Sequence, residues 1–105
     1  MLQFDENSNG NEIELHVGEE FLIILHENPT TGFRWNPISS GEPACMLLDN
    51  SFDLIESTPG NGGIHSWHFQ AEMEGSSKIE FAYRRSWEHG RPAAQTFTLS
   101  IYVRV

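Results

Sequence analysis

Apolar and polar residues alternate along much of this chain, and this pattern restricts the fold more than any other feature of the sequence. Four stretches show the alternation, with turn-forming residues between them: residues 12–17, 67–74, 79–83 and 97–105. Successive side chains of a β-strand point to opposite faces, so each stretch predicts a strand with one buried face. Residues 21–25 are apolar throughout, which predicts a central strand that is covered on both faces.

No long stretch keeps the helical period of about 3.6 residues. The best helical candidate, residues 42–50 with the sequence EPACMLLDN, is short and fits a strand equally well. Several short strands without crossover helices predict an all-β fold, an immunoglobulin-like antiparallel β-sandwich. The chain has 105 residues without an internal repeat or a linker, so we expect one domain over residues 1–105. The predicted loops are residues 26–35, 36–46, 57–63 and 84–95.

The composition excludes some classes of partner. Asp and Glu number 15 against 6 Lys and Arg, and the resulting charge of −9 repels a phosphate backbone, so we expect no nucleic-acid partner. No run of about 18 apolar residues occurs, so we expect no membrane insertion. No signal peptide is visible, which leaves periplasmic, secreted and cytoplasmic locations open. Cys45 is the only cysteine, so no disulfide can form within the chain, and we expect it to be a buried core residue.

The loop with the sequence HENPTTGFRW, residues 26–35, is unusually stiff and uncharged at its centre. Pro29 fixes its own φ and restricts Asn28, and the two following threonines are β-branched. Gly32 permits a positive φ. Such a loop keeps its shape before it meets a partner, so binding through it loses little conformational entropy. A plain turn between two strands is the alternative interpretation.

Two later loops also carry residues suited to binding. Residues 57–67, STPGNGGIHSW, hold three glycines that allow close backbone approach to another surface, although a flexible hairpin is the alternative. This loop lacks the Lys and the following helix of a phosphate loop. Residues 83–92, YRRSWEHGRP, contain Arg and Trp, the residue types that dominate interface energies. Trp87 is expected to be an exposed contact residue, unless it packs back onto its own domain.

Three motifs in this order resemble those of the chagasin-type inhibitors of papain-like cysteine peptidases. The first, NPTTGF at residues 28–33, and the second, GNGG at residues 60–63, match throughout. The third matches in part, because Arg85 and Trp87 flank Ser86 where the family usually has proline. Residues 91–93, RPA, offer a second alignment of this motif but lack its aromatic residue, so we prefer Arg85 and Trp87.

The resemblance implies an immunoglobulin-like sandwich that presents three loops at one end. It implies a monomeric, reversible inhibitor that needs no cofactor and performs no catalysis, with a papain-like cysteine peptidase as its partner. The first loop would enter the active-site cleft, with Thr30 and Thr31 nearest the catalytic cysteine, and the other two would grip its sides. The implied peptidase-binding residues are Asn28, Pro29, Thr30, Thr31, Gly32, Phe33, Gly60, Asn61, Gly62, Gly63, Arg85, Ser86 and Trp87.

Two other functional classes fit the residues less well. An enzyme or metal site would have to use the five histidines, but His65 and His68 are three apart on a predicted strand and would face opposite ways. An adhesion or carbohydrate-binding module would use its three tryptophans as a stacking platform. The alternation predicts that Trp35 and Trp67 lie in the core, which leaves only Trp87 for a sugar.

Overall fold

The computed structural model describes residues 1–28, 31–54, 62–85, 87–88 and 90–105. These residues form eight β-strands and a single short 3-10 helix, which confirms the all-β prediction. The elements in chain order are β1 (Leu2–Phe4), η1 (Glu6–Ser8), β2 (Glu12–His16), β3 (Glu20–Glu27), β4 (Phe33–Ser40), β5 (Cys45–Leu54), β6 (Gly63–Ala71), β7 (Gly75–Arg85) and β8 (Gln95–Arg104). In the described part of the chain, no helix has the length and apolar character to cross a membrane.

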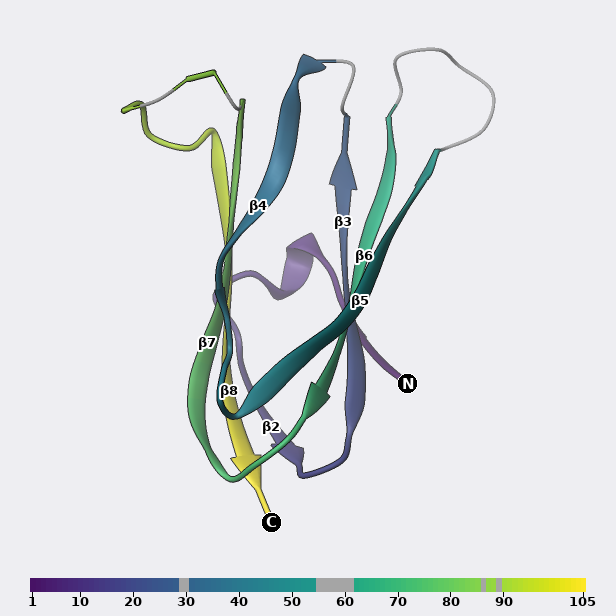
Figure 1. Cartoon of the computed structure of the whole chain (residues 1–105), viewed down its shortest axis with the longest axis vertical. Coiled ribbons are helices and arrows are strands. Elements are labelled where there is room, and N and C mark those ends of the chain that lie inside the picture. Colours follow the sequence, from purple (N-terminus) through teal and green to yellow (C-terminus); the bar gives the residue numbers. More distant parts are fainter. Residues whose placement is uncertain (29–30, 55–61, 86, 89) are drawn as a thin grey trace.

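The strands form two sheets that face each other as a sandwich (Figure 1). Sheet A has the order β1-β3-β6-β5, and sheet B has the order β2-β8-β7-β4. The four pairings among the longer strands are antiparallel, as predicted. The short strands β1 and β2 instead pair in parallel with β3 and β8 at the sheet edges. The sandwich is therefore mainly antiparallel, with one parallel pairing in each sheet.

The core lies between the sheets and includes most of the inward-facing residues that the alternation predicted. Two aromatic contacts lie in this core. Phe21 stacks on Phe69 with ring centroids 5.2 Å apart, and the ring centroids of Trp67 and Phe81 are 4.5 Å apart. The second contact joins β6 of sheet A to β7 of sheet B. The buried set is Leu15, Phe21, Ile23, Leu25, Trp35, Ala44, Cys45, Trp67, Phe69, Ala71, Ile79, Phe81, Phe97, Leu99, Ile101 and Val103.

Several predictions need correction, both of where the strands begin and end and of which side chains are buried. β3 is central in sheet A, but its outward residues Leu22 and Ile24 are only half-buried, because no second layer covers that face. The apolar residues Val17, Met73 and Val105 lie beyond the strand ends and are exposed. The ambiguous stretch at residues 42–50 enters β5 and forms no helix. Residues 33–40 form β4, although they lie within the loops expected at residues 26–35 and 36–46.

Cys45 is 1% exposed, which confirms that it is a buried residue. Burial raises the pKa of its thiol, and the thiolate is the reactive form. We therefore expect the native protein to react with an aromatic disulfide reagent, near pH 8, on the order of 100-fold more slowly than the urea-unfolded protein. Absorbance of the released thiol measures both rates, and equal rates would show that the start of β5 opens readily.

Candidate functional site

The loops that connect the strands at one end of the sandwich are those singled out in the sequence. β3 ends at Glu27 and β4 begins at Phe33, β5 ends at Leu54 and β6 begins at Gly63, and β7 ends at Arg85. Register pairs place these strand ends at one level, since Glu27 and Leu54 both pair with Gly63, and Phe33 pairs with Arg85. Figure 1 shows the same strand ends at the top of the molecule. The strand ends that carry the three motifs therefore lie at one end of the sandwich.

Arg85 ties the third loop to the first. Its Nε–H donates to the Thr31 carbonyl oxygen at 3.1 Å, and its guanidinium lies 4.5 Å from the centre of the Phe33 ring. On the other side it forms an ion pair with Glu88, with 3.1 Å between Nη1 and Oε1, and it lies 5.8 Å from the centre of the Trp87 ring. The guanidinium thus holds two aromatic rings and a backbone carbonyl in one cluster.

Trp87 is 64% exposed, as expected for a residue that contacts a partner, and its ring lies against the backbone of Gly32. Gly32 has φ +83°, a conformation that L-residues rarely adopt, and a Cβ at this position would overlap the six-membered ring of Trp87. The glycine of the first motif therefore serves two purposes. It allows the backbone to turn, and it leaves room for an indole from another loop.

The first loop rests on an aromatic stack. Phe33 stacks on Tyr83 with ring centroids 5.3 Å apart, and Tyr83 lies 4.8 Å from Trp35. The Tyr83 hydroxyl accepts a hydrogen bond from the backbone N–H of Asn28 at 3.1 Å. Thr31 closes the turn by donating from Oγ1 to the Asn28 carbonyl oxygen at 2.7 Å. The described ends of the loop are thus bound to the scaffold on both sides.

Glu27 is a site residue that the sequence reasoning missed. It immediately precedes the first motif and is 1% exposed, although it carries a carboxylate. Its Oε2 accepts the backbone N–H of Trp35 at 2.7 Å, and its Oε1 lies 3.0 Å from Nδ1 of His65. A signal was present in the sequence, because position 27 continues the inward-facing series of residues 21, 23 and 25.

The second loop approaches the first at its described end. Gly62 has φ +74°, and a Cβ there would lie 2.6 Å from the Glu27 carbonyl oxygen and 2.8 Å from the Asn28 Cα. Gly63 is packed against the backbone of Asp53 on the neighbouring strand. The glycine backbone here approaches the chain's own first loop, and its expected approach to another surface stays a prediction.

The structure brings together six of the predicted site residues: Asn28, Thr31, Gly32, Phe33, Arg85 and Trp87. Gly62 joins them through Asn28. The side chain of Arg85 contacts the first loop, and the choice of Arg85 over the alternative RPA at residues 91–93 stays a prediction. Five predicted residues lie outside the described part of the chain: Pro29, Thr30, Gly60, Asn61 and Ser86.

Other features do not form a competing site. Trp35 and Trp67 are buried, as predicted, so they cannot form a sugar platform with Trp87. His65 faces the sandwich interior beside Trp67, whereas His68 contacts Glu20 on the outer face. No group of three potential metal ligands occurs within the described ranges.

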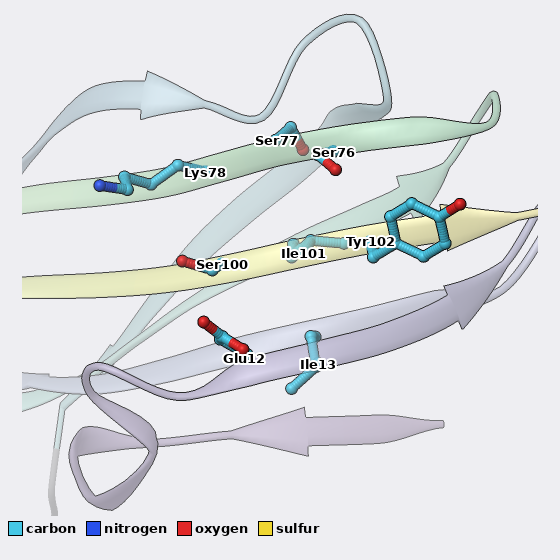
Figure 2. A pocket seen from close by; sticks show the side chains of 8 residues that line it. All are labelled: Glu12, Ile13, Ser76, Ser77, Lys78, Ser100, Ile101 and Tyr102. Carbon is cyan, nitrogen blue, oxygen red and sulfur yellow. The ribbon is translucent and has the colours of Figure 1, made fainter.

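A hollow of about 470 Å³ lies on β2, β7 and β8, and Figure 2 shows that its lining side chains come from these strands rather than from the loops.

Comparison with known proteins agrees with this geometry. Residues 14–101 match the family model described as Chagasin family peptidase inhibitor I42. The chain belongs to the chagasin family of peptidase inhibitors. Membership of this family confirms the resemblance seen in the three motifs and the prediction that the chain is not an enzyme.

Two relatives and one solved structure show how much of the chain the family likeness covers. Amoebiasin-1 from Entamoeba histolytica is 34% identical over 110 residues, which covers 98% of this chain and 100% of the relative. Chagasin from Trypanosoma cruzi is 28% identical and covers 87% of each chain. The crystal structure of a cysteine protease inhibitor from Entamoeba histolytica has a TM-score of 0.84 at 21% identity, covering 98% of this chain and 94% of the other, which confirms the chagasin-type sandwich.

Proposed function

We propose that this chain is a reversible inhibitor of papain-like cysteine peptidases and that it occludes their active-site cleft with three loops from one end of the sandwich. Residues 1–105 act as one inhibitor domain, and a monomer binds one peptidase. The contacts come from the thirteen motif residues: Asn28, Pro29, Thr30, Thr31, Gly32, Phe33, Gly60, Asn61, Gly62, Gly63, Arg85, Ser86 and Trp87. The first loop fills the centre of the cleft, and the other two lie against its walls.

The observation that carries this proposal is the cluster of Arg85, Trp87 and the first loop. Arg85 donates to Thr31 and lies over Phe33, while Trp87 covers Gly32 and remains largely exposed. An exposed indole beside a stiff turn is the kind of preformed surface from which interface hot spots are built. The crystallised relative described as a cysteine protease inhibitor shares the fold that presents these loops.

Inhibition of this kind requires no chemistry from the inhibitor. A standard interface buries about 1,600 Å² in total, which suffices for tight binding when little ordering is needed. The hydrogen bonds of Thr31 and Asn28 already hold the ends of the first loop in the free protein, so binding loses little conformational entropy. The cleft is filled by shape, and no peptide bond need be presented to the nucleophile.

The test is a titration of papain and a cathepsin L-type peptidase with the parent protein, followed by hydrolysis of a fluorogenic peptide. We expect stoichiometric inhibition by the parent. Trp87→Ala should raise the inhibition constant about 30-fold, as expected for loss of a hot-spot side chain. Thr31→Ala should weaken inhibition as well, because it removes the hydrogen bond that closes the turn at Asn28.

Ile38→Ala is the matched control for these variants. Ile38 is 60% exposed, much like Trp87, but it lies on β4 away from the strand end that carries the first loop. This variant should inhibit like the parent, and circular dichroism should show that all three variants are folded. If the parent inhibits no papain-like peptidase at micromolar concentration, the loop end binds a different partner and the proposal fails.

A further inference from the structure

The bases of the first and second loops are joined by a buried carboxylate. Glu27 is the last residue of β3, directly before the first loop, and His65 follows the second loop on β6. Glu27 Oε1 lies 3.0 Å from His65 Nδ1, with side-chain exposures of 1% and 17%. A buried carboxylate is unfavourable unless its oxygens are paired, and the second oxygen accepts the Trp35 N–H. This single side chain therefore contacts β4 and β6 at the level of the loops.

His65 is held in one orientation by residues of two strands. Its ring stacks on Trp67 with centroids 3.9 Å apart and planes 3° apart, and the Phe52 ring meets it edge-on at 6.1 Å. Its Nε2 lies 2.9 Å from Oδ1 of Asn50 on β5. The imidazole therefore already points at Glu27, and the hydrogen bond requires no reordering of its side chain.

The direction of this hydrogen bond follows from the acceptor. A carboxylate only accepts hydrogen bonds, so Nδ1–H of His65 donates to Glu27. Among the described residues the charged group in contact with the ring is Glu27 from β3. Asn50 and Phe52 from β5 and Trp67 from β6, which also contact the ring, are uncharged.

The backbone makes a second contact at the same place. Gly62 leaves no room for a side chain against the carbonyl oxygen of Glu27 and the Cα of Asn28. The end of the second loop thus lies directly on the start of the first. Any movement of Glu27 relative to His65 would move the first and second motifs relative to each other.

We propose that the Glu27–His65 hydrogen bond positions the first loop relative to the second for peptidase binding. The inference rests on the proposed function, but neither residue belongs to the three motifs or needs to touch the peptidase. Both are positioning residues: they hold the two loops at a fixed separation in the free protein. When this hydrogen bond, here called the link, is lost, the two loops are less ordered in the free protein. More conformational entropy is then lost on binding, and the complex dissociates faster.

The first test compares three histidine variants by their inhibition constants and dissociation rates. His65→Leu leaves Glu27 without its side-chain partner and should raise the inhibition constant about tenfold. His65→Asn places an amide nitrogen near the position of Nδ1 and should restore most of the loss. The matched control is His68→Leu on the same strand, because His68 pairs with Glu20 at 2.7 Å on the outer face and should change inhibition less than about twofold.

Rescue by His65→Asn separates this role from a general loss of packing. An equal loss of inhibition in His65→Leu and His65→Asn would overturn the proposal.

A measurement without peptidase distinguishes this proposal from the proposed function. Amide hydrogen exchange of Trp35 and Asn28 should be faster in His65→Leu than in the parent. The Trp35 N–H donates to the Glu27 carboxylate, and the Asn28 N–H, which belongs to the next residue after Glu27, donates to the Tyr83 hydroxyl. If the parent inhibits but His65→Leu changes neither exchange nor inhibition, the link is overturned and the function stands. If the parent inhibits nothing but exchange is faster in the variant, the function fails and the link stands.

Discussion

Replacing Gly32 by alanine is expected to raise the inhibition constant about 100-fold while the sandwich remains folded. The φ of +83° is unfavourable for an L-residue by roughly 1–2 kcal/mol. The new Cβ would also overlap the Trp87 ring, so the indole must leave its place over the first loop. Loss of a hot-spot side chain typically adds roughly 2 kcal/mol, and the two effects together correspond to about 100-fold or more in affinity.

Gly18→Ala is the control for the backbone contribution. Gly18 has φ +95° in the turn between β2 and β3, at the end of the sandwich opposite the loops, and a Cβ there would meet nothing within 4 Å. This variant should be slightly less stable and should inhibit like the parent. Titration of a papain-like peptidase with both variants, together with their circular dichroism spectra, measures the difference. Parent-like inhibition by Gly32→Ala would mean that the contact between the first loop and Trp87 is not needed.

Trp67→Ala is expected to have the largest effect on stability. Trp67 is 2% exposed and lies between the His65 ring at 3.9 Å and the Phe81 ring at 4.5 Å, so it bridges the two sheets. Removing a buried tryptophan usually costs about 3–5 kcal/mol, because the surroundings cannot close over the cavity. Since a domain of this size is stable by roughly 5–15 kcal/mol, urea unfolding should show a much lower midpoint.

Trp87→Ala provides the comparison, because it removes the same side chain from an exposed position. Its free energy of unfolding should differ from that of the parent by less than about 1 kcal/mol, while its inhibition falls. Comparison of the two variants thus separates the effect of a tryptophan on stability from its effect on binding. A change of less than about 1 kcal/mol for Trp67→Ala would show that the contact between the sheets does not depend on this ring.

The sequence predicted the parts of the site that depend on local backbone chemistry. Gly32 was expected to permit a positive φ, and its backbone uses this freedom with φ +83°. Trp87 was expected to be an exposed contact residue, with packing onto its own domain as the alternative, and it is 64% exposed. Glu27 was missed, because a glutamate beside a loop is usually solvated, and its burial depends on partners 8 and 38 positions away.

Two strands were not predicted. Residues 33–40 were expected to lie in loops, yet they form β4 because β7 supplies their pairing partners across a bulge. β1 was not predicted, since a strand of three residues has too little pattern to recognise and is held by parallel pairing to β3.

The sequence by itself determined the class of fold and the residues of the three loops, because alternation and turn chemistry act between near neighbours in the chain. Only the tertiary structure decided that Arg85 bonds to Thr31, that Trp87 lies over Gly32 and that His65 binds Glu27. These contacts join residues that are distant in sequence, and they form because the strand register brings the ends of β3, β6 and β7 to one end of the sandwich.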